Sequence, residues 1–265
     1  MVYLAAGVSG LTAIVGTFFI KDYLNLSAAF LASLGFWAGL PWALKMPLGH
    51  LVDLIWNYTA YLVGLGAAVI AASLLIMYGL IGHAGFMASI MPVETWFVTS
   101  VILGPVGYVI QDVVADAMTV EAVPEQDKNG NDIDPDQLKI MHTTMQTLGR
   151  FAIIGGTVLV SLANVIIFTD VENLDTAARI DLYADIYLYA LIIPVISIAG
   201  VVLARLQHSY RNARAQHAHN IATSPHHPPE INWSILLGSL VFVVFSLSVG
   251  TVSYTHLTLP TTPYV

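Results

Sequence analysis

The sequence predicts an all-α membrane protein. Only 10% of its 265 residues are charged and 57% are hydrophobic, whereas about a quarter of the residues of an average soluble domain are charged. The mean hydropathy is correspondingly high, at +0.74. Apolar stretches of about 20 residues, the length that a helix needs to cross the hydrocarbon core of a bilayer, recur along the chain. We expect six complete transmembrane helices and a truncated seventh.

The expected helices follow these apolar stretches in order. Lys21 and Asp22 end the first stretch, and Ser27 begins the second, because serine caps helix N-termini by accepting a backbone hydrogen bond. Pro41 and Pro47 are expected to kink or end the second helix, because proline has no backbone N–H to donate. The predicted spans are 2–20, 27–48, 58–81, 96–120, 142–168 and 186–206, and the seventh begins at Trp233.

Polar segments divide the chain into predicted parts. Residues 1–206 form an N-terminal six-helix bundle, 207–232 a cytoplasmic interdomain linker, and 233–251 the start of a second bundle. Within the bundle, a polar turn over 49–53 and a polar loop over 121–139 separate helices. Lysine and arginine concentrate on the side of the 121–139 loop and the linker. We therefore expect a multi-pass protein of the cell (inner) membrane with a cytoplasmic N-terminus.

The C-terminal tail differs in character from the rest. Residues 252–257 resemble the translation of an adaptor used to prepare sequencing libraries, and the residues after them lack the composition of a membrane segment. We expect residues 252–265 to be non-native and the natural part of the sequence to end near Gly250 or Thr251. On this interpretation the chain is the front of a longer protein. A short natural polar tail is the alternative.

Composition also excludes several classes of function. The chain contains no cysteine, which excludes disulfides and thiolate metal sites, and its formal net charge of −8 argues against nucleic acid as a partner. The sequence contains no nucleophile elbow, P-loop or zinc-helix motif. We therefore expect no enzyme activity, no cofactor and no metal site.

Two carboxylates in the fourth predicted helix are the first candidates for a functional site. Asp112 and Asp116 are four residues apart, which places both on one face of a helix. An acid within the hydrocarbon costs roughly 2.5 to 3.5 kcal/mol on insertion scales, so it normally faces a protein interior or a water-filled path. Asp112 and Arg150 lie at about the same depth from the predicted inner helix ends, and we expect an ion pair between them. The alternatives are a permanent pair that only fixes helix packing, and a wet interfacial position for Asp116.

The fifth predicted helix has a polar face. His142, Gln146 and Arg150 recur at four-residue spacing, so their side chains share one side of the helix. Together with Gln111, they are candidates for substrate or ion coupling beside the two acids. Trp37, Trp42 and Tyr108 are aromatic residues at membrane depth that could contact a flat ligand. Core packing is the more common role of such residues.

The order of these segments resembles the major facilitator superfamily, whose transporters consist of two six-helix halves. Residues 47–53, Pro-Leu-Gly-His-Leu-Val-Asp, resemble the cytoplasmic signature of that superfamily. The resemblance implies that Gly49 allows a tight turn and that Asp53 latches the closed cytoplasmic gate. With Lys45 at the adjoining helix end, they are the candidate gating residues. A plain turn is the alternative.

Three further segments resemble the folate-biopterin transporter family in order and spacing. They are FFIKDYLNLS at 18–27, LPWALKMPLG at 40–49 and QDVVADAMTVE at 111–121. The resemblance implies a proton-linked or exchange carrier for a pteridine such as folate or biopterin, embedded in the lipid bilayer, working by alternating access and monomeric when full length. The alternatives are a carrier of the same superfamily for another solute, such as a sugar or a drug, and a non-transporting membrane assembly factor of the same fold.

Overall fold

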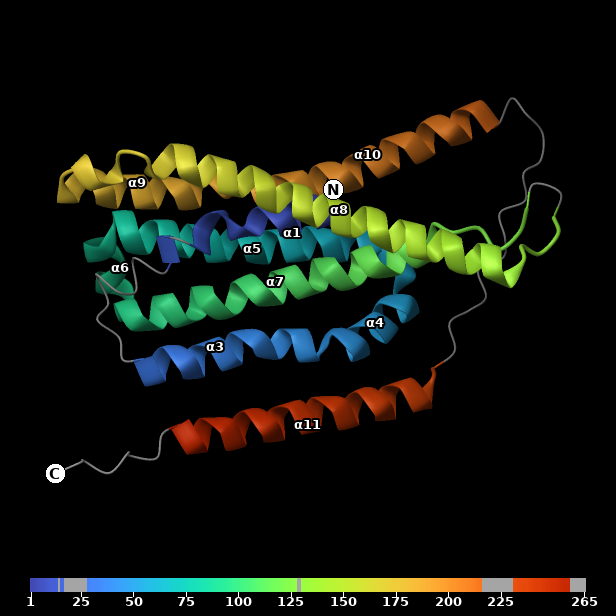
Figure 1. Cartoon of the computed structure of the whole chain (residues 1–265), viewed down its shortest axis with the longest axis horizontal. Helices are drawn as coiled ribbons and strands as arrows, with labels where there is room; N and C mark the ends of the chain where they lie inside the picture. The colour runs from blue at the N-terminus through green and yellow to red at the C-terminus, as the bar shows by residue number, and fades with distance from the viewer. Residues whose placement is uncertain (14, 17–27, 128–129, 216–230, 258–265) are drawn as a thin grey trace.

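The computed structural model describes residues 1–13, 15–16, 28–127, 130–215 and 231–257. Apart from an isolated antiparallel bridge between Gln126 and Asp132, these residues form helices joined by turns and short loops. The long helices run alongside one another as a bundle (Figure 1). Among the described residues, the helical segments long and apolar enough to cross a membrane are Trp56–Gly82, Val93–Glu121, Pro135–Asn173 and Thr176–Gln207. The structure is therefore an all-α membrane protein, as predicted.

Helices α5 (Thr59–Gly82) and α7 (Val93–Glu121) form the centre of the bundle and agree closely with the third and fourth predicted spans. They pack against each other where Gly66 meets Gly107: a Cβ built on Gly107 would lie 2.7 Å from the Gly66 carbonyl oxygen. Small residues permit such close approach of helices in membranes. A short helix that was not predicted, α6 (Ala84–Ile90), connects the two.

The second predicted helix is broken in two. Helix α3 (Ala28–Ala43) ends just before Leu44, and α4 (Lys45–Leu54) begins just after it. The two prolines explain the break, because Pro47 has no N–H for the carbonyl of Ala43, and the Leu44 amide turns back to the Pro41 carbonyl at 3.1 Å.

The polar turn predicted over 49–53 is wrong. These residues continue α4, and the chain turns only at Ile55, before the 3-10 helix η3 (Trp56–Tyr58). Among the described glycines the positive backbone φ belongs to Gly130, so Gly49 provides no left-handed turn. Asp53 lies near the C-terminus of α4, and the helix dipole does not favour a carboxylate at that end.

The first and fifth predicted helices differ from their spans at one end. Helix α1 (Val2–Val8) continues as the 3-10 helix η1 (Ser9–Thr12), and residues 14 and 17–20 of the predicted span lie outside the described part of the chain. Helix α8 (Pro135–Phe168) begins seven residues before the predicted position 142. Its start is fixed by Asp134, whose carboxylate accepts from the amides of Asp136 and Gln137, so the polar loop is shorter than predicted.

The sixth predicted span begins earlier and is interrupted. Helix α9 (Thr176–Tyr189) starts behind the capping residue Asp175 and is followed, after a short break, by α10 (Ile192–Ala215). Pro194 explains the break, because it leaves the carbonyl of Ala190 to accept from Ile193 at 2.9 Å instead. The beginning of the predicted linker 207–232 is thus helical, and 216–230 lies outside the described residues.

The last helix, α11 (Trp233–Leu257), lies along one edge of the bundle (Figure 1). Its main contacts are with α3 and α4. It includes residues 252–257, so the start of the predicted non-native tail is helical; its origin stays a prediction.

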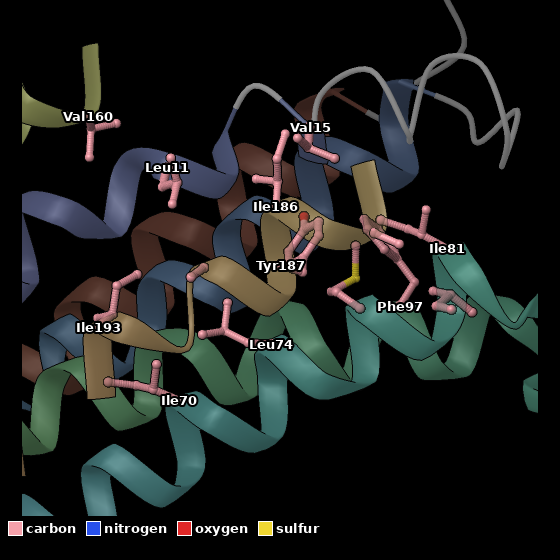
Figure 2. Close-up of a cluster of buried hydrophobic side chains, with 14 of the residues drawn as sticks. Leu11, Val15, Ile70, Leu74, Ile81, Phe97, Val160, Ile186, Tyr187 and Ile193 are labelled. Atoms are coloured by element: carbon pink, nitrogen blue, oxygen red, sulfur yellow. The ribbon is translucent and has the colours of Figure 1, made fainter. Parts of the chain in front are cut away.

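The buried core lies between α1, η1, α5, α7 and α9. Figure 2 shows side chains of this core, with Phe97 and Ile81 at one end and Ile70 and Ile193 at the other; α8 and α10 add Val160 and Ile193 to it. A smaller apolar cluster joins α4, α5 and α7 through Val52, Val63, Val109, Val113 and Val114. The second cluster holds α4 against the face of α7 that carries the two acids.

Candidate functional site

An ion cluster joins α4 to α7. The Nζ of Lys45 lies 2.5 Å from Oδ2 of Asp112 and 2.8 Å from Oδ2 of Asp116. The Tyr3 hydroxyl, on α1, donates a hydrogen bond of 2.5 Å to the other oxygen of Asp116. The Lys45 ammonium therefore bridges two carboxylates on a single face of α7, and the Tyr3 phenol binds one of them, Asp116.

The local fold explains why these groups meet. Lys45 is the first residue of α4, so the break at Leu44 sets the direction in which its side chain leaves the backbone. The ring of Tyr3 packs on Gly149 of α8, where an added Cβ would lie 2.8 Å from a ring carbon. The cluster thus depends on three separate helix contacts around α7.

The cluster is partly open to its surroundings. The Asp112 side chain is 16% exposed, whereas Asp116 is 47% exposed and Lys45 is 37% exposed. Asp112 is therefore the more desolvated of the two acids. The expected position of the acids at a protein interior holds for Asp112, and Asp116 lies at its boundary.

The predicted ion pair between Asp112 and Arg150 is wrong, because Lys45 takes that place. Gly149 and Gly156 face α1, and Arg150, rotated by about 100° from Gly149, is exposed on the outside of α8. Gln146 is exposed as well, and His142 is half-buried. The predicted polar face of α8 exists, but the structure does not bring it to the cluster.

Gln111 is buried beside the cluster and connects three helices. Its Nε2 donates to the Val63 carbonyl of α5 at 3.1 Å, and its Oε1 accepts from the Ser197 hydroxyl of α10 at 2.9 Å. With only 2% of its surface exposed, this amide uses both its donor and its acceptor inside the protein. Gln111 therefore holds the helices together and does not line an open space.

An open cavity lies beside the cluster, between α4, α7 and α11, with a volume of about 730 Å³. The predicted gating residues Lys45, Gly49 and Asp53 line it together with Asp116 of the acid pair. Residues that the sequence did not suggest also line it: Trp56, Glu121 and Phe242. The packing of α4 on α7 thus brings the predicted gating residues together with the acid pair.

The aromatic candidates separate into different environments. Trp42 lines this cavity, at the end of α3. Trp37 is 51% exposed and packs edge-on against Phe36, with ring centroids 5.5 Å apart. Tyr108 lines a smaller cavity of about 240 Å³ between η1, α5, α7 and α9, with Ser73 and Ser100. Trp42 is therefore the aromatic candidate that belongs to the ion cluster's cavity.

Within the described residues, no group of three or more histidine, cysteine, aspartate or glutamate side chains is arranged to hold a metal ion. In the ion cluster, a cationic group that pairs with one carboxylate would leave Lys45 to the other.

Comparison with known proteins gives no relative for this chain. No family model matches it, and neither the search of curated proteins nor the search of solved structures found a match.

Proposed function

We propose that the chain belongs to a secondary transporter of the major facilitator type, which moves a small organic solute by alternating access. The observation that carries the proposal is the Lys45, Asp112 and Asp116 cluster on the wall of a 730 Å³ cavity. Ligand cavities in proteins measure roughly 300 to 1,000 Å³, and ionisable groups within membrane segments commonly mark solute or ion pathways. The first substrate candidate is a pteridine, such as folate or biopterin.

The chemistry of the cluster suits coupling between an ion and a solute. Lys45 pairs with two carboxylates at once, so each acid shares its counter-ion with the other. Protonation of one acid, or its pairing with a donor group of the solute, frees the ammonium for the remaining acid. A solute and a proton can thereby compete for the same carboxylate, which is the requirement for coupled transport.

The cavity also suits a flat heteroaromatic solute. Trp42, Trp56 and Phe242 supply ring faces, and Asp53 and Asp116 supply acceptors for the adjacent N–H groups of a pterin ring. The exposed polar face of α8, with His142, Gln146 and Arg150, lies outside this cavity, so we assign coupling to the α4 and α7 residues first. The N-terminus is placed in the cytoplasm in this proposal.

Uptake measurements test the proposal. Cells that express the gene are given labelled folate or labelled biopterin, and the Asp112→Asn variant is compared with the unaltered protein at equal membrane abundance. We expect uptake of at least one pteridine, and a fall of about ten-fold in the variant, because the neutral amide leaves Lys45 with Asp116 alone. Glu94→Gln is the control, because Glu94 is exposed at the opposite end of the same helix.

Two results would count against this function. Uptake unchanged by Asp112→Asn would reduce the acid to a packing role. No uptake of either pteridine, with the protein present in the membrane, would favour another solute or a membrane assembly factor of the same fold.

A further inference from the structure

The charges around the cavity are unequal. Asp53 and Asp116 line it, and Asp112 is tied to it through Lys45, the ammonium on its wall. Three carboxylates against one ammonium leave a formal charge of −2, and Glu121 is a further acidic residue on the wall. Among the described residues that line the cavity, Lys45 is the single lysine or arginine.

This ammonium is already committed. Lys45 has both Asp112 and Asp116 within 2.8 Å, so a ligand anion would have to displace a protein carboxylate to pair with it. A displaced carboxylate would remain in the same partly desolvated space beside the new anion. Like charges facing each other at close range suppress binding of the wrong partner.

Aromatic residues form the other side of the cavity. Trp42 and Phe242 line it and also line a second cavity of about 470 Å³ between α3 and α11. That second space is open because Gly35 and Gly39 have no side chains there, and a Cβ on either would meet nothing within 4 Å. A flat ring that enters between Trp42 and Phe242 therefore has room to continue along α3.

We propose that the ligand of this site is a flat heteroaromatic molecule without net negative charge, with an N–H-rich edge toward the acids and its remainder toward Trp42 and Phe242. The proposal rests on the transport function proposed above and narrows its substrate class. Of the two kinds of pteridine, the site takes pterins with an uncharged side chain, such as biopterin. It rejects folates, because their side chain ends in two carboxylates.

The test is binding to the purified chain in nanodiscs of zwitterionic lipid, measured by equilibrium dialysis. The probes are labelled biopterin, labelled folate and labelled folate dimethyl ester, which has nearly the size of folate but lacks its two negative charges. We expect biopterin and the ester to bind with dissociation constants at least about ten-fold lower than that of folate at low salt. The difference in dissociation constant between folate and the two uncharged probes should narrow at about 0.5 M NaCl, because salt screens the repulsion between the folate carboxylates and the acids of the cavity.

A pair of variants locates the charge effect. Asp53→Asn should strengthen folate binding relative to ester binding by about three-fold or more, because it removes one repelling carboxylate from the cavity wall, whereas the loss of an acceptor for the pterin ring affects both probes alike. Asp181→Asn makes the same change at an exposed position on α9 outside this cavity and should alter neither.

The outcomes separate the two proposals. Folate binding as tight as that of its ester would overturn the charge selection and leave pteridine transport standing. Binding of the ester as weak as that of folate would also overturn the charge selection, because the size of the side chain and not its charge would then exclude folates. If none of the three probes binds and cells take up neither pteridine, the proposed function itself fails, and the substrate class fails with it.

Discussion

Two adjacent glycines of α8 give the sharpest test of the packing that positions the ion cluster. A Cβ on Gly156 would lie 2.8 Å from the Gly7 Cα and 2.8 Å from the Leu4 carbonyl oxygen, both backbone atoms of α1. Backbone atoms cannot turn aside as a flexible side chain can, so α1 would have to move. A Cβ on Gly155 would meet nothing within 4 Å. Gly156→Ala and Gly155→Ala are thus the same chemical change at two positions of one helix about 100° apart, one packed against α1 and one facing open space.

The size of the effect follows from two terms. Alanine is favoured over glycine in a helix by roughly 0.5 to 1 kcal/mol, and this gain applies equally to both positions. Overpacking at a close contact costs about 1 to 3 kcal/mol, and this cost applies to Gly156 alone. We therefore expect the free energy of unfolding of Gly156→Ala to be about 1 to 3 kcal/mol below that of Gly155→Ala.

The assay is unfolding in mixed micelles with increasing SDS, with both variants and the unaltered chain in the same detergent. Equal stabilities of the two variants would refute the reasoning, because they would show that α1 and α8 do not approach at Gly156. A second readout is functional: α1 carries Tyr3 to Asp116, so Gly156→Ala should also reduce pteridine uptake, whereas Gly155→Ala should not.

Further predictions concern the cluster and a helix start. Lys45→Met should lower thermal stability and abolish uptake, because Asp112 and Asp116 then face each other without a cation, whereas Lys45→Arg should retain more of both. The control is Lys139→Met, at an exposed position on α8. Effects of Lys139→Met equal to those of Lys45→Met would contradict the prediction. Asp134→Ala should lower the free energy of unfolding by about 1 kcal/mol in the same assay, because it removes the side chain that caps α8. An unchanged unfolding midpoint would show that Pro135 alone fixes the helix start.

Hydropathy predicted the long central helices well because their sequences have few competing signals. The third and fourth predicted spans agree with α5 and α7 to within a few residues at each end, and Pro105 does not interrupt α7. The start of α9 was missed because Asp181 and Asp185 make its first turns polar, so the apolar window begins only later. Composition therefore predicts where a helix crosses an apolar layer, and it loses the ends that extend beyond.

The partner of Asp112 could not be predicted in the same way. The depth of Arg150 along its helix was compatible with an ion pair to Asp112. Whether Arg150 or Lys45 forms that pair depends on which side of α8 faces the bundle. Gly149 and Gly156 decide that side by their close contacts with α1, seven residues apart on one face. Long-range contacts of this kind, like that between Tyr3 and Asp116, leave no periodic pattern in the sequence.

The break at Leu44 connects the ion cluster to the side of the cavity that α11 forms. Helices α3 and α4 are separate segments that meet at Leu44, and the first residue of α4 is Lys45. Helix α11 contacts the bundle chiefly through α3 and α4 and supplies Phe242 to the cavity. In the proposed transport cycle, a movement of α11 against the bundle would act on the segment that carries Lys45, and opening of the cavity would thereby alter the pairing of the two acids.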